Sequence, residues 1–228
     1  MKVNKQFFGG DKMTAVVAVR KGSQRIPNKN ITPFGDSNLL EMKLEILKKV
    51  SNIDEIIVNS DCDEMLAIGE KYGCLTHKRE DHYASSIVNN SDFHEHIAKV
   101  TDTDFIFLAP TCSPFISAET HEKAIMKFLF RDYDSLTSVD VIKNHLWMDD
   151  EPLNYDVNNE PNSQDLPDVK RLNYGISIIT KELMLKNRSL IGNNPGFYEL
   201  DHFESVDVDT PFDFFIAEQI HEKYYKNN

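Results

Sequence analysis

The chain has 228 residues, of which 40% are hydrophobic, and its formal net charge at pH 7 is -12. This length allows one sizeable α/β core with a small insert, and the composition is ordinary for a globular domain. The acidic balance, without a basic stripe along the chain, argues against a nucleic-acid partner. No apolar run approaches a membrane span, and residues 1–12 are too polar for a signal peptide. We therefore expect a cytoplasmic protein with no membrane partner, with an N-terminal tail at residues 1–12 and a single domain at 13–228.

The first regular element is the β-branched run 14–19, which predicts a buried strand. The loop that follows has no apolar period and contains the cations Arg20, Lys21, Arg25 and Lys29. Backbone N–H groups and cations at the end of a first strand are suited to holding phosphates. No G-K-[ST] sequence is present at the spacing of a Walker loop. A solvated basic turn is the alternative interpretation of the same loop.

Strand and helix signals then alternate along the chain. Asn38 and Glu41 form a capping-box pattern ahead of a helix whose leucines 40, 44 and 47 share one face. Further helices are expected at 63–72, 91–100, 118–130 and 211–225. Further strands are expected at 55–59, 75–78, 104–109, 135–139, 175–180 and 205–208. This alternation predicts a doubly wound, mainly parallel sheet that binds its ligands at the carboxyl ends of the strands.

Residues 140–172 interrupt the alternation. The segment is rich in Asn, Asp and Pro and contains Trp147, the one tryptophan of the chain. A structureless stretch of this length is unusual inside a compact domain. It is either a surface loop or an excursion that packs against another body.

Asp207 and Asp209 form a second group of chemically active residues. If 205–208 is a strand, the period of two places both carboxylates on one face. Two carboxylates at the end of a strand are suited to holding Mg²⁺ together with substrate phosphates. The spacing alone is a weak signal, because Asp61 and Asp63 share it as expected turn and cap residues.

The loop after the first strand resembles the N-terminal signature of the CMP-sialic acid synthetase family, the acylneuraminate or nonulosonic acid cytidylyltransferases. That signature is usually written A-R-x-G-S-K-x-x-P-x-K-N, and it is matched here by Arg20, Gly22, Ser23, Pro27, Lys29 and Asn30. Val19 and Gln24 depart from it, and Arg25 lies beside Gln24. The family's late metal-binding motif is similar to residues 206–214.

The middle of the chain resembles the family more loosely. Arg79 and the segment with Asn89 and Ser91 resemble the part that holds the cytosine and ribose, and a capped surface helix is the alternative. Residues 108–115 resemble a strand end in which Ala109 replaces a glutamine that touches the sugar, and Cys112 adds a residue. Residues 173–175 resemble a strand entry with changed spacing.

The resemblance implies a Rossmann-like nucleotidyltransferase fold and transfer of CMP from CTP to a 2-keto sugar acid, with Mg²⁺ as cofactor. It implies a homodimer in which residues 140–172 reach toward the partner's site. The implied catalytic residues are Arg20, Lys29, Asp207 and Asp209, and the last two are the implied metal ligands. The implied nucleotide-binding residues are Arg20, Gly22, Ser23, Lys29, Asn30, Arg79, Asn89 and Ser91. The implied sugar-binding residues are Lys143, Arg171, Asn173 and Phe197.

Substrate choice is expected to depend on a few groups around the sugar. The candidate apolar walls are Phe115, Tyr174, Phe197 and Tyr198, although each is also consistent with a core position. Since Ala109 lacks the family's polar group, we expect a modified nonulosonic acid to be preferred over N-acetylneuraminic acid. Two alternatives remain: a glycosyltransferase with a D-x-D metal pair, and a non-catalytic binding module.

Overall fold

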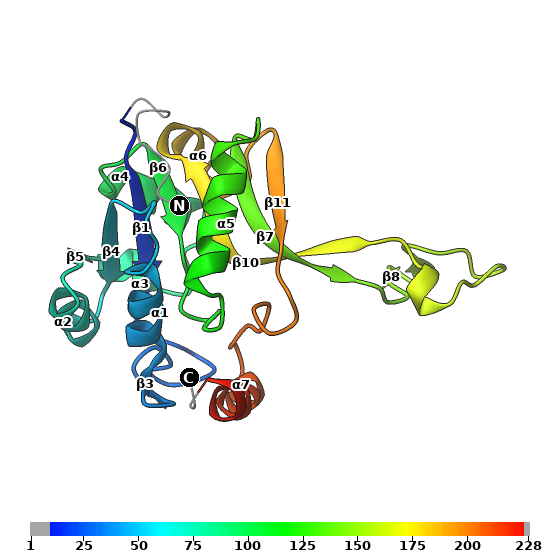
Figure 1. The fold of residues 1–228 in the computed structure, drawn as a ribbon, viewed down its shortest axis with the longest axis horizontal. Coiled ribbons are helices and arrows are strands. Elements are labelled where there is room, and N and C mark those ends of the chain that lie inside the picture. The colour runs from blue at the N-terminus through cyan, green and yellow to red at the C-terminus, as the bar shows by residue number, and fades with distance from the viewer. Residues whose placement is uncertain (1–9, 226–228) are drawn as a thin grey trace.

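The computed structural model describes residues 10–225 and centres on a seven-stranded sheet (Figure 1). The strand order is β11-β7-β10-β6-β1-β4-β5. The strands are β1 (Met13–Ala18), β4 (Glu55–Ser60), β5 (Leu75–Lys78), β6 (Phe105–Leu108), β7 (Ser135–Ile142), β10 (Val169–Thr180) and β11 (Pro195–Glu199). Within this sheet β10 runs antiparallel to its neighbours β6 and β7, while the other strands are parallel to one another. The expected doubly wound, mainly parallel sheet is confirmed.

Helices cover both faces of the sheet. The first face carries α1 (Leu39–Leu47), α2 (Asp63–Lys71) and α5 (Ala118–Leu129), whose apolar residues join the largest core cluster. The second face carries α4 (Asn90–Val100) and α6 (Lys181–Asn187) around a smaller cluster. The short helix α3 (Asp81–Ala84) precedes α4, and β2 (Pro33–Phe34) pairs with β3 (Ser37–Asn38). The closing helix α7 (Pro211–Tyr224) packs with Phe34 and Phe115 in a third cluster.

The local start and stop signals act as the sequence indicates. Asn38 caps α1, since its side chain accepts from Glu41 N at 2.9 Å while Glu41 Oε2 accepts from the Asn38 amide. At the end of α2, Gly73 has a φ of +70°, a conformation that glycine adopts without steric cost. The helices and strands expected up to residue 139 are all present, with bounds shifted by at most a few residues.

The expected strand at 205–208 is wrong, because these residues form no ladder with any strand of the sheet. The strand at the edge of the sheet beside β7 is β11, which the sequence analysis did not identify, and α6 was also missed. Val208 is instead fully buried in the third cluster, and its N–H donates to the carbonyl of Cys112 at 2.8 Å. A single backbone contact to the turn after β6 therefore replaces the expected ladder.

Residues 140–172 form a projecting arm rather than an irregular loop. Both sides of its base are strands, since β7 and β10 stay paired from Leu172–Val139 to Val169–Ile142. Beyond them lie the hairpin β8 (Trp147–Met148) and β9 (Glu151–Pro152) and a 3₁₀ turn at Ser163–Asp165. Figure 1 shows the arm extending well beyond the body of the molecule.

The sequence predicts an N-terminal tail at residues 1–12 and no membrane span. The expected tail lies mostly at residues 1–9, outside the described residues, and Lys12 at its end donates its N–H to Asp104 Oδ2 at 2.7 Å. Among residues 10–225, none of the helices has the length and apolar character needed to cross a bilayer.

Candidate active site

The carboxyl ends of β1, β4, β5 and β6 meet at one edge of the sheet, where open α/β folds bind their ligands. The basic loop leaves β1 at this edge and is tied down at both ends. Lys21 N donates to Asp61 Oδ1 at 3.0 Å, and the Thr111 hydroxyl donates to Asn30 Oδ1 at 2.7 Å. Asn30 is only 5% exposed, so its side chain holds the loop against the turn after β6. The loop is therefore fixed at its two ends, while most residues between them are exposed, as a solvated turn would have them.

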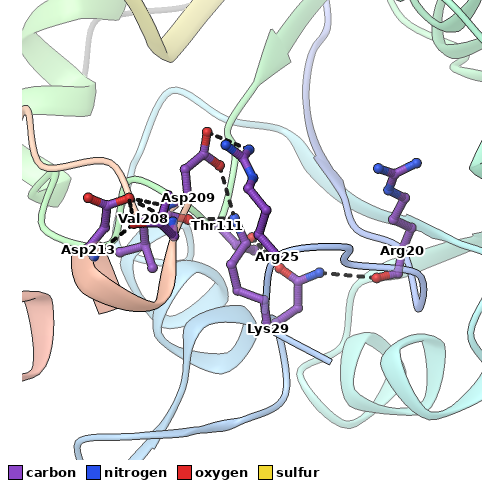
Figure 2. Close-up of polar contacts among 9 residues, drawn as sticks. Arg20, Arg25, Lys29, Thr111, Val208, Asp209 and Asp213 are labelled. Carbon is purple, nitrogen blue, oxygen red and sulfur yellow. Dashed lines mark hydrogen bonds and ion pairs between the residues drawn. The ribbon is translucent and has the colours of Figure 1, made fainter. Parts of the chain in front are cut away.

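Two cations of the loop converge on the carboxylate segment (Figure 2). Lys29 Nζ donates to the carbonyl of Val208 at 2.5 Å and lies 3.4 Å from Asp209 Oδ1. Arg25 Nη2 lies 2.8 Å from Asp209 Oδ2. Arg20 points elsewhere, since its Nη1 donates to the carbonyl of Ala84 at 3.0 Å. Arg25 and Lys29 thus meet at Asp209, while Arg20 lies apart from them.

A cavity of about 230 Å³ runs beneath these cations. It is lined by Arg20, Ser23, Lys29 and Asn30, all predicted, and also by Gln24, Arg25 and Asp209. Gly22 does not line it, and a Cβ at that position would meet nothing within 4 Å. Gln24, which departs from the family signature, and its neighbour Arg25 therefore both line this cavity.

The two carboxylates differ in their surroundings. Burial raises the pKa of Asp207, and the nearby charge of Asp209 raises it further. Burial also raises the pKa of the Cys112 thiol to about 12, with the charge of Asp207 acting in the same direction. Asp207 therefore lies in a place that disfavours its own negative charge, whereas Asp209 is compensated by Arg25 and Lys29.

These carboxylates fit a magnesium ion that substrate phosphates also coordinate. Among residues 10–225, no three His, Cys, Asp or Glu side chains are grouped to hold a metal by themselves. Mg²⁺ is commonly bound through one or two carboxylates together with phosphate oxygens and water. A cation beside Asp207 would also relieve the cost of burying its charge. The donor set therefore suits a metal that arrives with a phosphorylated substrate.

A second cavity of about 410 Å³ opens on the other side of Arg20. Arg79 lines it and is only 4% exposed, with hydrogen bonds of 2.6 Å to Asn59 Oδ1 and to the carbonyls of Asn59 and Val19. Its guanidinium lies 5.2 Å from the centre of the Phe93 ring, and burial lowers its pKa to about 10. Arg79 thus ties the ends of β1 and β4 together, and Tyr83 and Phe93 add aromatic wall.

The predicted helix end beside this cavity is present but shifted by one residue. α4 begins at Asn90, and Asn89 is its cap, with Oδ1 accepting from Asp92 N at 2.8 Å. Asn90 lines the cavity, whereas the exposed Asn89 and Ser91 do not.

A third cavity, of about 620 Å³, lies between the base of the arm and α7. It contains the predicted residues Arg171, Asn173, Asp207 and Asp209. Arg171 pairs with Asp140 across the strands at 2.8 Å, and Asn173 Oδ1 accepts from Gly175 N at 3.3 Å. Tyr174, Phe212 and Ile216 supply apolar surface, and the last two were missed because they read as ordinary helix residues.

Two predicted sugar-binding residues lie away from this cavity. Lys143 is on the arm, where its Nζ lies 3.2 Å from Asp168 Oδ1. Phe197 is on the edge strand β11 opposite Thr137, near the Lys170 ammonium. Phe115 is 2% exposed and belongs to the third core cluster, so it is not a wall of the site.

The three cavities adjoin one another, and together they are called the track. Ala18, Arg20 and Gln24 line both the first and the second cavity, and Asp209 lines both the first and the third. The order along the track is an aromatic pocket, a row of cations, a pair of carboxylates and a pocket with mixed polar and apolar walls. Such an order suits a nucleoside, its phosphates, a metal and an acceptor, which are the components that a nucleotidyltransferase brings together.

Comparison with known proteins identifies the family to which the chain belongs. A family model described as "Cytidylyltransferase" matches residues 14–166, and the chain belongs to that family of enzymes. The alternative of a glycosyltransferase is thereby excluded. The chain is 25% identical over 215 residues to the post-translational flagellin modification protein B of Campylobacter coli, covering 89% of this chain and 92% of that protein. It is 24% identical over 216 residues to the CMP-N,N'-diacetyllegionaminic acid synthase of Campylobacter jejuni, with the same coverage.

A further relative is larger than this chain. The N-acylneuraminate cytidylyltransferase of Escherichia coli is 26% identical over 222 residues, which make up 93% of this chain but 52% of that protein. The chain therefore spans about half the length of that relative.

Solved structures support the fold. The 4-diphosphocytidyl-2C-methyl-D-erythritol synthase of Anaerococcus prevotii has a TM-score of 0.74 at 18% identity, covering 96% of this chain and 100% of that one. A CMP:2-keto-3-deoxy-manno-octonic acid synthetase solved with CTP has a TM-score of 0.67 at 14% identity, covering 93% and 99%. The Rossmann-like nucleotidyltransferase fold is confirmed.

Proposed function

We propose that the protein transfers CMP from CTP to a nonulosonic acid, releasing pyrophosphate and forming a CMP-sugar. The anomeric hydroxyl of the acid attacks the α-phosphate of CTP, and the bond to the β-phosphate breaks. The observation that carries the proposal is the set of three adjoining cavities, in which cations and carboxylates line the smallest cavity between two larger ones. The names of the relatives from Campylobacter jejuni and Escherichia coli agree with this substrate class.

The loop cations would serve the triphosphate. Phosphoryl transfer depends mainly on positioning and on neutralising charge, so fixed cations beside the phosphates are what the reaction needs. Arg20 and Ser23 line the phosphate cavity, while Lys29 and Arg25 hold Asp209 when no substrate is bound. Phosphates entering this cavity would compete for the two cations and leave Asp209 free to bind a metal.

Mg²⁺ would be held by Asp207 and Asp209 and, when bound, supplies positive charge beside the reacting phosphate. The chain's own contribution is to fix both carboxylates. The N–H and the carbonyl of Val208 are bonded to Cys112 and Lys29, which locks the backbone between them.

Arg171 and Asn173 would face the acid, with Arg171 offering a cation for its carboxylate. Ala109 is fully buried and lines none of the three cavities, so it offers the sugar no polar contact. The preference for a modified nonulosonic acid over N-acetylneuraminic acid therefore rests on the sequence difference at this position.

A homodimer is part of the proposal. The arm, which Figure 1 shows projecting from the body of the molecule, exposes Trp147, Met148, Leu153 and Val157, each at least half exposed. Apolar side chains gathered on a projecting hairpin commonly mark a protein interface. A partner seated on the arm would cover this surface and bring the arm's Lys143 toward a neighbouring site.

The proposal is tested by pyrophosphate release. The purified protein is incubated with Mg²⁺, CTP and, in turn, N-acetylneuraminic, legionaminic and pseudaminic acids, and CMP-sugar is identified by mass spectrometry. Release that requires both CTP and one of the acids supports the proposal. The proposal would be contradicted if none of the acids in the panel led to pyrophosphate release, or if ATP supported release as well as CTP does.

A further inference from the structure

Lys43 is a buried charged residue that lies outside the track. It sits in the middle of α1, has no exposed surface, and is among the largest fully buried side chains of residues 10–225. It lines none of the three cavities. A lysine is almost never fully buried unless its ammonium has a partner. Here that partner is the carbonyl of Ser113, to which Lys43 Nζ donates at 2.8 Å.

Ser113 belongs to the turn after β6, and the two residues before it hold other parts of the site. The Thr111 hydroxyl donates to Asn30 Oδ1 at 2.7 Å, which fixes the end of the basic loop. The carbonyl of Cys112 accepts from Val208 N at 2.8 Å, and Val208 lies between the two aspartates. Three consecutive residues of the turn therefore hold the basic loop, the carboxylate segment and the buried ammonium.

The turn also touches the base of the arm. Gly175 of β10 lies so close that an added Cβ would be 3.0 Å from Ser113 Oγ and 2.5 Å from Ile116 Cδ1. Arg171 and Asn173, on the same strand, line the acceptor cavity. The position of the turn is thus shared by the cations, the carboxylates and the acceptor cavity.

Three titratable groups face the Lys43 ammonium: Cys112 from the turn, Glu204 from the segment before the aspartates, and His121 from α5. Burial lowers the pKa of Lys43 to about 8. Burial, together with the Lys43 charge, lowers the pKa of His121 to about 3, and burial raises the pKa of Cys112 to about 12. Between pH 7 and 9, Lys43 therefore gives up its proton while His121 stays neutral and Cys112 stays a thiol.

The charge on Lys43 has opposite effects on the whole fold and on the turn. Burial favours the neutral amine, so keeping the ammonium lowers the free energy of unfolding. A charged donor, however, makes a stronger hydrogen bond to a carbonyl than a neutral one does. The charge therefore strengthens the contact with Ser113 at the expense of overall stability, which is the pattern of a group that serves a site.

We propose that Lys43 is a positioning residue, whose buried ammonium fixes the turn after β6 and thereby sets the basic loop and the carboxylates relative to one another. This role rests on the proposed function, since the groups that it positions are those that would bind CTP and the metal. Alignment matters in phosphoryl transfer, and a displacement of about 1 Å can cost about 100-fold in rate.

The kinetic test compares Lys43→Met with the matched control Lys48→Met. Lys48 follows the last residue of α1, and its Nζ donates to the carbonyl of Tyr72 at 2.8 Å, an exposed bond of the same kind. We expect Lys43→Met to lower kcat/KM for CTP by at least about tenfold at pH 7, and Lys48→Met to keep the wild-type value. Lys43→Gln, which keeps a donor without the charge, should recover part of the loss.

Amide hydrogen exchange at Val208 gives a readout that does not depend on activity, because this N–H is bonded to the turn. In Lys43→Met without substrate, exchange at Val208 should be several-fold faster than in the wild type, while the amides of β4 stay as protected. In the wild type, raising the pH from 7 to 9 should speed exchange at Val208 beyond its intrinsic pH dependence while the free energy of unfolding rises. A lysine that only stabilised the fold would move both quantities in the same direction.

The outcomes separate this role from the proposed function. A folded Lys43→Met variant with wild-type kcat/KM and wild-type exchange at Val208 overturns the positioning role while the cytidylyltransferase proposal stands. If Lys43→Met does not fold, Lys43→Gln and the pH comparison in the wild type decide, and exchange at Val208 that follows β4 in both overturns the role. A wild-type protein with no CTP-dependent activity on any acid overturns the proposed function, and exchange at Val208 still decides whether Lys43 holds the turn.

Discussion

The nucleotide end of the track is closed by buried polar contacts, whereas its acceptor end is lined by exposed side chains. Arg79 and Asn30 are 4% and 5% exposed, and their hydrogen bonds join strand ends and loops. Phe212 and Tyr174, at the other end, remain 70% and 40% exposed. A pre-organised pocket suits a cosubstrate that never changes, while an open pocket allows the acceptor to vary by substitution of a few residues.

The largest effect is expected where the two ends meet, at the carboxylates. Asp207→Asn and Asp209→Asn should each reduce Mg²⁺-dependent pyrophosphate release by about 100-fold or more, because each removes half of the charge offered to the metal. Since burial and Asp209 raise the pKa of Asp207, its charged form is disfavoured in the folded protein, and Asp207→Asn should not lower the melting temperature. Asp63→Asn, at an exposed helix start, is the matched control. Full activity in both Asp207→Asn and Asp209→Asn would show that the two carboxylates do not bind the metal.

The next effect concerns the loop cations. Arg20→Ala and Lys29→Ala should each lower kcat/KM by at least about tenfold, roughly 1.4 kcal/mol of transition-state stabilisation, since neither side chain contributes to the core clusters. Lys21→Ala is the control, because its side chain lines none of the three cavities. Steady-state kinetics with CTP varied, together with circular dichroism, measure the effect. Near-normal turnover by either folded variant would show that the substituted residue does not act on the phosphates.

A several-fold effect is expected from the arm. Replacing residues 143–168 by a short Gly-Ser turn, which leaves the paired bases of β7 and β10 intact, should give monomers with reduced activity. Sedimentation velocity at micromolar concentration measures the assembly. A wild-type protein that is itself monomeric there would show that the exposed arm does not hold two subunits together.

The smallest expected effect is on the free energy of unfolding, and it concerns the turn after β6. Lys43 of α1 is fully buried beneath it, its Nζ donates to the carbonyl of Ser113 at 2.8 Å, and burial lowers its pKa to about 8. In the unfolded chain Lys43 stays protonated up to the ordinary pKa of a lysine. Between pH 8 and that ordinary pKa, the unfolded chain therefore binds more protons than the folded protein does.

The free energy of unfolding should therefore rise with pH in this window, by about 1 kcal/mol between pH 8 and 9. In urea titrations at these two pH values, Lys43→Met should lack this rise, and Lys48→Met, on the exposed end of the same helix, should keep it. An equal rise in the wild type and Lys43→Met would assign the effect to other groups.

The sequence by itself determined the family, the doubly wound class and most elements up to residue 139. These signals are local: the apolar run of β1, the Asn38–Glu41 cap and the ordered residues of the basic loop are each complete within about a dozen positions. The changed spacing at residues 173–175 was also visible, and it coincides with the interruption of the β7–β10 pairing between Leu172 and Ser177.

The tertiary structure alone decided how the carboxylates are held and what surrounds the acceptor. Asp207 and Asp209 read as strand residues, yet Val208 between them is held by Cys112 and Lys29, which are distant in sequence. Phe212 and Ile216 read as part of an ordinary helix face and line the acceptor cavity only because α7 docks beside the arm's base. Periodicity reports which face of an element is apolar, but the body that covers that face, or leaves it open, is set by packing between distant segments.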